Sequence, residues 1–395
     1  MSKDITIGLI PSPDMPQKMV SKIIDHLGSE MAHHVDDEVN WRFSQYVASI
    51  IGTAEHVDKA IDIAIDIRKS EDWDFAICIT DLPSISSTKT VICDINKASQ
   101  TAMLSLPALG VMNLKNKLRD LITGIVSYIY HDQDELPHLI KKHHKLSRVT
   151  EVQPKGDDEN EDETTRLIVK STILGWLHLI TGMTLANEPW TAIFDFKKII
   201  SVSFATGTYI SIFSTPWDLS LHYDYWRFIL LTLLSIFGMV GWLIYAYHLW
   251  EPPNPRTQRL YRYVYNFTTL TTLTIITFLN YLALFVLLTF SILLFVPASL
   301  FAGWTSLELN NPTAGDYFHL IWFVTSLGIL AGAMGSAVES ADKIKRVTYS
   351  YRQYFRYETL EQQEEKEEDS QHEAEDDDKN YEGNKQSHDK EEEDE

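Results

Sequence analysis

The chain has 395 residues, a formal net charge of −21 and a mean hydropathy of −0.13. This hydropathy is low for a protein that crosses a membrane several times, so apolar residues must be concentrated in one part, and residues 190–340 hold them. The tail from Glu358 to Glu395 contains 19 acidic residues and 4 lysines, an excess of 15 negative charges. Because an acidic tail opposes phosphate and no wide basic face is visible, composition disfavours nucleic-acid binding.

Residues 1–147 predict a cytosolic α/β domain with an open, mostly parallel sheet of the Rossmann or flavodoxin type. Apolar and polar residues alternate over 5–9 as in a strand, and Pro16 fits the first turn of the following helix. Similar patterns predict strands near 39–43, 73–79, 90–93 and 101–106, and helices near 19–27, 57–65 and 114–130. No signal peptide is recognisable and the chain has two cysteines, Cys78 and Cys93, which favours a reducing compartment.

The ligand site of such a domain is expected outside the carboxyl ends of its strands. Three loops qualify by position: 11–16, 80–83 and 105–110. The candidate ligand-binding residues in the last two are Asp81, Pro83, Ser105, Pro107 and Gly110. Asp81 suits a ribose hydroxyl, a metal or a substrate amine; alternatively it bonds backbone amides within a proline-containing turn, and Asp94 has the same two interpretations. No catalytic residue and no cofactor is identified.

The motifs expected of two kinds of site, a phosphate-binding loop and a metal site, are not recognised. Neither G-x-G-x-x-G nor G-x-x-x-x-G-K-[ST] occurs in residues 1–165, so a phosphate cradle would be atypical. The run His33, His34, Asp36, Asp37 and Glu38 is rich in metal-ligand types, but no H-x-x-x-H or C-x-x-C accompanies it. We therefore interpret this run as a solvated turn and expect no metal site.

Several segments together resemble a known group of proteins. They are I-G-L-I at 7–10, H-V-D at 34–36, W-D-x-A-x-C-x-T-D-L-P at 73–83, S-L-P-A-L-G at 105–110, N-x-P-W at 187–190 and A-T-G-x-Y at 205–209. This pattern is similar to an uncharacterised family of bacterial multi-pass membrane proteins with an N-terminal α/β domain, often labelled methylenetetrahydrofolate dehydrogenase. The folate enzyme's Tyr-x-x-x-Lys and Gly-x-Ser-x-x-Val-Gly motifs are missing from residues 1–147. The resemblance therefore implies the architecture and transfers no catalytic residue.

A linker is expected between the domain and the apolar part. Residues 148–165 are polar and acidic, and the basic cluster Lys141, Lys142 and Lys145 precedes them. This cluster either contacts anionic lipid headgroups or is ordinary solvated chain. Residues 166–190 predict an interfacial amphipathic helix, although a membrane span is the alternative for 167–186.

Residues 191–340 predict a four-helix transmembrane domain. The expected spans are about 196–214, 228–249, 271–297 and 319–338. Loops with Lys or Arg alternate with loops that have none, so the positive-inside rule places both termini in the cytosol of a cell-membrane protein. Residues 341–395 are expected to form a basic juxtamembrane segment and a disordered acidic tail.

The spans carry little ionisable chemistry at membrane depth, which disfavours a classical transporter. Asn280 and Tyr281 either line a polar path or form interhelical hydrogen bonds, while Gly328, Gly332 and Gly335 predict close packing within the chain or in a homo-oligomer. The main hypothesis is a membrane protein, with no enzymatic activity, whose α/β domain senses a small ligand or recruits a partner. The alternatives are a membrane-anchored enzyme acting on a folate-like or nucleotide-like substrate, and a small channel.

Overall fold

The fold was analysed in a computed structural model of the full chain. The structure describes residues 3–48, 57–131, 149–154, 164–253, 259–305, 312–335 and 341–345. The basic cluster Lys141, Lys142 and Lys145 and the acidic tail lie outside these described residues. The described parts belong to one compact unit, Met1–Tyr349.

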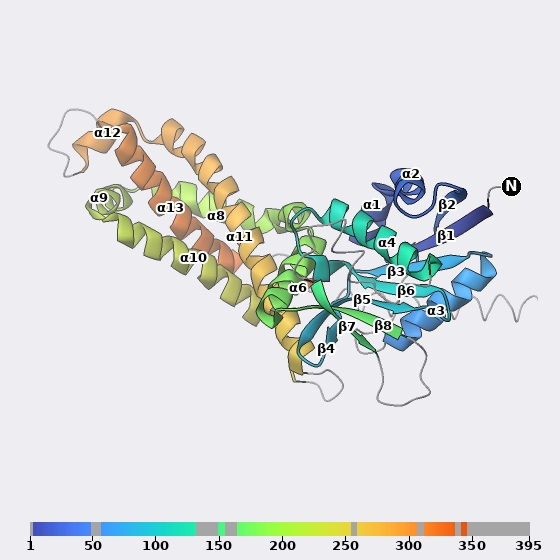
Figure 1. The fold of residues 1–395 in the computed structure, drawn as a ribbon. Helices are drawn as coiled ribbons and strands as arrows, with labels where there is room; N and C mark the ends of the chain where they lie inside the picture. Colours follow the sequence, from blue (N-terminus) through green and yellow to red (C-terminus); the bar gives the residue numbers. More distant parts are fainter. Residues whose placement is uncertain are drawn as a thin grey trace, which may run out of the picture. The chain divides into compact units, whose positions relative to one another are not determined.

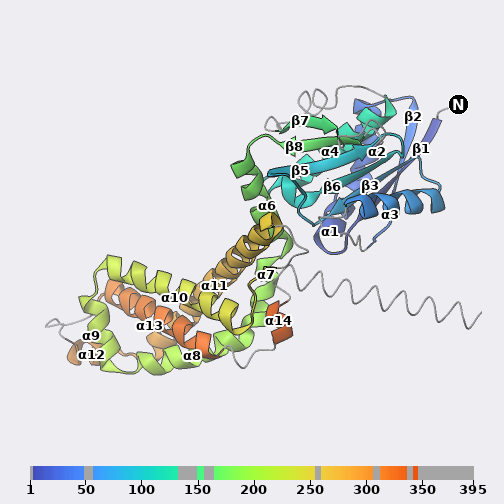
Figure 2. The ribbon, with the colours of Figure 1, turned by 90° about the horizontal axis from the view of Figure 1, so that it is seen from below.

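The N-terminal part is built on a mixed sheet with the strand order β2-β1-β3-β6-β5-β8-β7, and β4 pairs with β5 (Figures 1 and 2). The strands are β1 (Lys3–Pro11), β2 (Val39–Gln45), β3 (Phe75–Thr80), β4 (Ile85–Ser86), β5 (Lys89–Asn96), β6 (Thr101–Ser105), β7 (Val149–Pro154) and β8 (Thr164–Val169). Neighbours from β2 to β6 pair in parallel, whereas β5, β8 and β7 pair antiparallel. Five of the seven strands in this order therefore point the same way.

Helices cover both faces of the sheet, because a continuous apolar strand such as β3, with all six residues buried, must be covered on both sides. They are α1 (Met15–Ser21), α2 (Ile24–His34), α3 (Val57–Ser70), the 3-10 turn η1 (Leu106–Leu109) and α4 (Leu114–Tyr130). Phe75, Ile77 and Ile79 of β3 join the larger core with residues of α2 and α4. Ala76 and Cys78, which point the opposite way, join a smaller core with Ala64 of α3.

Two sequence expectations for this part need correction. The helix expected over 19–27 is split between α1 and α2, although Pro16 does lie in the first turn of α1. The expected linker 148–165 and the start of the expected helix 166–190 contain β7 and β8, which extend the sheet beyond β5. The helix itself, α6 (Thr172–Ala186), begins later and buries Leu179 and Met183 in the core of the sheet domain.

A buried ion pair fixes β8 in place. Arg166 of β8 donates from Nε to Asp94 Oδ1 at 2.6 Å and from Nη2 to Asp94 Oδ2 at 3.1 Å. Its Nη1 donates to Ser86 Oγ at 3.0 Å, so a single side chain ties β8, β5 and β4 together. Asp94, which sequence placed in a loop after a strand, lies inside β5 and is 2% exposed.

The C-terminal part is helical. Its elements are α7 (Pro189–Ala192), the 3-10 turn η2 (Ile193–Phe196), α8 (Lys197–Ser211), α9 (Ser214–His222), α10 (Tyr225–Ala246), α11 (Arg259–Phe295), α12 (Ala298–Gly303), α13 (Ala314–Gly335) and α14 (Ala341–Lys345). Three of them, α10, α11 and α13, are long and apolar enough to cross a membrane. At 15 residues α8 is shorter, although α7 and η2 precede it without a break.

α8, α10, α11 and α13 form a bundle whose successive helices run in opposite directions (Figures 1 and 2). Tyr281 of α11 meets Ser326 of α13, and Val296 meets Tyr317, so these two helices are antiparallel. Gly328 and Gly332 of α13 face α8, where a β-carbon added at Gly328 would lie 3.1 Å from the carbonyl oxygen of Ser203. Small residues thus let the two backbones approach closely within one chain.

Candidate functional site

The carboxyl ends of β1, β3 and β6 lie at one edge of the sheet, because these strands are parallel neighbours. Pro11 is in register with Ile79, and Thr80 with Ser105. The backbone N–H of Ser12 donates to the carbonyl of Ile79 at 2.9 Å, which joins the loop after β1 to the end of β3. The sheet therefore brings together the loops that sequence selected at 11–16, 80–83 and 105–110.

This edge includes a topological switch point. The chain leaves β1 to form β2 on one side and later returns to form β3 on the other. Open α/β sheets bind ligands in the crevice that such a reversal creates. The loop at this position has an unusual backbone, since Asp14 has a φ of 69°, a left-handed value that non-glycine residues seldom adopt.

The candidate residues at this edge are all buried. Asp81 and Ser105 are each 2% exposed, and Pro83, Pro107 and Gly110 are buried as well. Ser105 Oγ donates to the carbonyl of Leu82 at 2.6 Å, and the N–H of Leu82 donates to Thr80 Oγ1 at 3.1 Å. The side chains of Thr80 and Ser105, at the ends of β3 and β6, thus bind the 80–83 loop, and both interpretations of Asp81 stay predictions.

Helix α6 covers the η1 part of the edge. A β-carbon added at Gly182 would lie 2.6 Å from Pro107 Cα, so this glycine permits the backbones of α6 and η1 to touch. Gly110 has a φ of 70°, and a β-carbon there would lie 2.9 Å from Cδ2 of His178. Both glycines are required by close contact between α6 and the 105–110 loop.

Helix α11 reaches the neighbouring strand β4. The hydroxyl of Tyr261 accepts a hydrogen bond from the N–H of Ile85 at 3.0 Å and donates one to the carbonyl of the same residue at 3.1 Å. Tyr261 is 2% exposed. A residue far along the chain thus satisfies both backbone groups of Ile85, and nothing in the local sequence signals this pairing.

Sequence reasoning also missed Ser12 as a single residue, although it named the surrounding loop. Ser12 is fully buried, and its Oγ has no hydrogen-bond partner within the described part of the chain. Buried hydroxyls are normally bonded, so this hydroxyl at a switch point is a candidate contact for a ligand. Its position directly after the apolar run of β1 was the available signal.

Lys117 and the two cysteines are ionisable side chains of the sheet domain with shifted pKa values. Lys117 of α4 donates from Nζ to the carbonyl of Leu109 at 2.7 Å, and burial lowers the pKa of this lysine. The thiols are inert, because burial raises the pKa of Cys78 to about 12 and raises the pKa of Cys93 well above its ordinary value. Neither cysteine provides a nucleophile at neutral pH.

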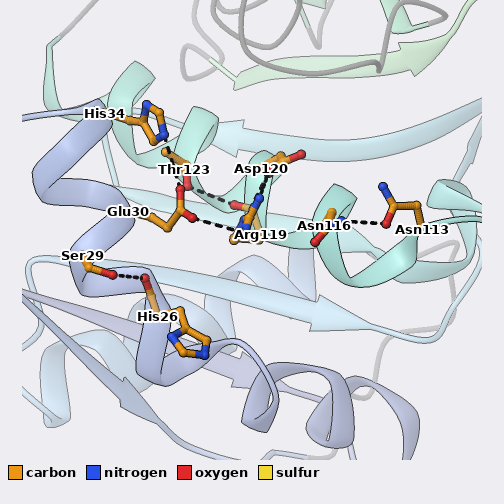
Figure 3. A network of polar contacts seen from close by, with 9 residues as sticks. All are labelled: His26, Ser29, Glu30, His34, Asn113, Asn116, Arg119, Asp120 and Thr123. Carbon is orange, nitrogen blue, oxygen red and sulfur yellow. Dashed lines mark hydrogen bonds and ion pairs between the residues drawn. The ribbon is translucent and has the colours of Figure 1, made fainter.

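The histidine-rich run 33–38 connects the end of α2 to the start of β2, so it lies at the edge of the sheet opposite the candidate site. His34 and Arg119 both contact Glu30, at 3.4 Å and 3.2 Å, and this network joins α2 to α4 (Figure 3). Asp36 accepts hydrogen bonds from the N–H of Glu38 and from the hydroxyl of Tyr130, and these two bonds lower its pKa. Among the described residues, no group of three or more His, Cys, Asp or Glu side chains is arranged to hold a metal ion.

In the bundle, polar side chains bond one another between helices. Tyr281 contacts Ser326 at 2.8 Å, and Trp322 Nε1 donates to Thr232 Oγ1 at 2.7 Å, which connects α10, α11 and α13. Tyr281 thus forms the interhelical bond that one interpretation of this residue expected. Asn280 Oδ1 is buried without a partner in the described part of the chain.

Comparisons with protein-family models, curated proteins and solved structures found no match for this chain. The family resemblance and every functional assignment therefore stay predictions from the residues themselves.

Proposed function

We propose that this chain is a four-span membrane protein whose α/β domain senses a small ligand or recruits a partner, and that α11 transmits the bound state to the membrane helices. The observation that carries this proposal is that α11 belongs to both hydrophobic cores. Tyr261, Val264 and Tyr265 pack in the core of the sheet domain, and residues from Leu273 to Ile292 pack in the core of the bundle.

The closed strand-end edge explains how binding would be transmitted. Because α6 packs on Pro107 and Gly110, and Tyr261 bonds Ile85 just after the 80–83 loop, a ligand that enters among the buried candidate residues would displace one of these helices. A continuous helix of 37 residues is about 55 Å long, and α11 has its first turns in one core and its later turns in the other. Displacement at its first turns would therefore be felt within the bundle.

Exposed aromatic residues support a membrane position for all four helices of the bundle. Trp226 and Trp304 are exposed near the end where α10 begins, and Tyr245 and Trp250 near the end where it finishes. Tryptophan and tyrosine are enriched at both membrane–water interfaces. The two sets are separated by the length of α10, about 33 Å for 22 residues, close to the thickness of a hydrocarbon core.

The charges at the two ends differ in sign. Exposed Lys197 and Lys198 begin α8 at one end, whereas Asp224 and Asp316 begin α10 and α13 at the other. Arg227, the basic residue at the acidic end, lies over the rings of Tyr223 and Trp226. The positive-inside rule then favours a cytosolic location for the end with the lysines, and hence for the α/β domain of a cell-membrane protein.

Thiol labelling in intact cells tests the four-span arrangement. Both native cysteines are buried, so a cysteine introduced on the surface is labelled selectively. We expect Asp218→Cys, in α9 between α8 and α10, to react with a membrane-impermeant maleimide from outside. Met112→Cys, 82% exposed on the α/β domain, should react only after lysis. If both variants react on the same side, α8 does not cross the membrane and the proposed arrangement is wrong.

Ligand screening of the full-length protein tests the sensing role. Residues 1–147 alone lack β8, α6 and Tyr261, so the whole chain in detergent is the proper sample. We expect one compound in a library of nucleotides, folates and other metabolites to raise the unfolding midpoint, or a partner protein to co-purify.

Binding should also change hydrogen exchange of α11 near Tyr261. Tyr261→Phe should weaken that change, and Tyr263→Phe, 46% exposed, is the matched control. A screen with neither a stabilising compound nor a partner would remove the basis of this role.

A further inference from the structure

An ion pair at the surface joins the first helix of the sheet domain to the segment that leads into the bundle. Lys18 of α1 donates from Nζ to Oε1 of Glu188 at 2.7 Å and to Oε2 at 2.9 Å. Glu188 is the N-cap of α7, after which η2 and α8 follow directly. One side chain of the sheet domain therefore holds the residue at which the path into α8 begins.

On the sheet-domain side, two backbone hydrogen bonds attach this pair to the candidate ligand edge. The N–H of Lys18 donates to the carbonyl of Asp14 at 3.0 Å, and the N–H of Gln17 donates to the carbonyl of Ser12 at 3.2 Å. Asp14 has a left-handed φ of 69°, and the buried hydroxyl of Ser12 has no partner in the described part of the chain. A change in this loop therefore acts directly on the turn of α1 that carries Lys18.

On the bundle side, Glu188 also has an unusual backbone and is attached to two elements. Its φ of 46° is left-handed, and such conformations of non-glycine residues concentrate at sites that bind or switch. Its carbonyl accepts hydrogen bonds from the N–H of Thr191 at 2.9 Å and from the hydroxyl of Thr191 at 2.8 Å. The preceding residue, Asn187, donates from Nδ2 to Thr272 Oγ1 of α11 at 2.9 Å. The position of Glu188 thus bears on both α7 and α11.

Water reaches this pair, in contrast to the buried contact of Tyr261 with Ile85. The side chain of Lys18 is 55% exposed and that of Glu188 is 22% exposed. An ion pair of this kind contributes little to stability, so it can open without unfolding either hydrophobic core. A contact that opens at low cost suits a switch between two states.

We infer that the Lys18–Glu188 pair is a latch, a contact that couples the loop after β1 to α8 and opens when that loop changes. In the conformation described, Lys18 holds Glu188 and the start of α7 in place. A ligand that bonds the Ser12 hydroxyl would shift the loop and the turn of α1 bonded to it, and would thereby release Glu188. This inference rests on the proposed sensing role, and it adds a second route to the bundle beside α11.

Hydrogen exchange of the full-length protein in detergent tests whether the pair holds this segment. We expect Lys18→Gln and Glu188→Gln each to speed the exchange of the amides at 188–196 about two- to fivefold, the effect of losing an exposed ion pair. Charge reversal, Lys18→Glu with Glu188→Lys, should bring the rate back toward the native value. Lys22→Gln is the matched control, because this exposed lysine at the end of the same helix should leave the rate unchanged.

A second measurement separates a latch from a pair with a structural role alone. Ser12→Val disturbs the loop itself. It should speed exchange at 188–196 in the native background, but not when Lys18→Gln has already released Glu188. Ser12→Thr is the milder replacement for use if the valine variant does not fold. Raised salt should likewise speed this exchange in the native protein and leave the Lys18→Gln variant unchanged.

Two results would overturn the inference. One is an effect of Ser12→Val that is equal in the two backgrounds, and the other is a charge-reversed pair that restores nothing. The thiol-labelling pattern and the exchange of α11 near Tyr261 do not depend on the Lys18–Glu188 pair. A failure of the latch is therefore distinguishable from a failure of the proposed function.

Discussion

In the sheet domain a buried charge pair joins strands that are far apart in sequence, whereas in the bundle hydroxyl groups and glycines join the helices. Arg166 and Asp94 are neighbours across β8 and β5, and the carboxylate is 2% exposed. In the bundle the corresponding contacts between helices are neutral. Examples are the hydrogen bond between Tyr281 and Ser326 and the close approach of Gly332 to Ser203. Neutral polar contacts suit a lipid environment, because a charged side chain there cannot be hydrated.

The largest expected effect comes from breaking the charge pair. Arg166→Ala leaves Asp94 buried without its partner, and losing one member of a buried pair costs about 3–5 kcal/mol of unfolding free energy. Arg42→Ala is the control, because Arg42 pairs with Asp4 on the surface, where such pairs contribute about 0–1 kcal/mol. Denaturant titration of the two variants in detergent measures the difference. Equal losses of unfolding free energy in the two variants would show that the burial of Asp94 does not increase the cost of removing its partner.

An intermediate effect is expected at the glycine contact. In Gly332→Ala the new β-carbon overlaps Ser203 Oγ, and overpacking of this kind costs about 1–3 kcal/mol. Gly241→Ala in α10 is the control, since no atom lies within 4 Å of the added carbon, and alanine favours a helix. Thermal unfolding should show a lower midpoint for the first variant and an unchanged or higher one for the second. An equal response would place α8 and α13 further apart than described.

The smallest effect is expected for the hydrogen bond between Tyr281 and Ser326. A double-mutant cycle of Tyr281→Phe and Ser326→Ala should give a coupling of about 0.6 kcal/mol, the average for such bonds between membrane helices. Steric-trap or detergent unfolding measurements can resolve it. A coupling as large as the cost expected for Arg166→Ala would contradict the contrast between the two regions.

Local patterns predicted much of this fold. Strict alternation identified β1 and β2, and a continuous apolar run identified β3, because burial of one or both faces of a strand leaves these patterns directly in the sequence. β8 was read as the start of a helix, since Leu167 to Val169 is too short an apolar run to distinguish the two. Its pairing with β5 is a contact between distant segments, which no local pattern records.

The position of the candidate site could be predicted from the sequence, but the packing of other helices on it could not. Parallel topology alone placed the loops with Asp81 and Ser105 at one edge. The helices that cover the neighbouring Pro107 and Ile85 come from distant parts of the chain, through Gly182 of α6 and the Tyr261 hydroxyl of α11. The charge count likewise predicted which end of the bundle carries lysines, but not that Trp190 and Phe194 stand exposed beside them.

The sharing of α11 between two cores also sets an order for biosynthesis. A domain of this size ordinarily folds as a unit while the rest of the chain is still being made. Here three residues of the larger core, Tyr261, Val264 and Tyr265, leave the ribosome only after α8 and α10. The larger core of the sheet domain is therefore completed only by residues that follow α8 and α10 in the chain.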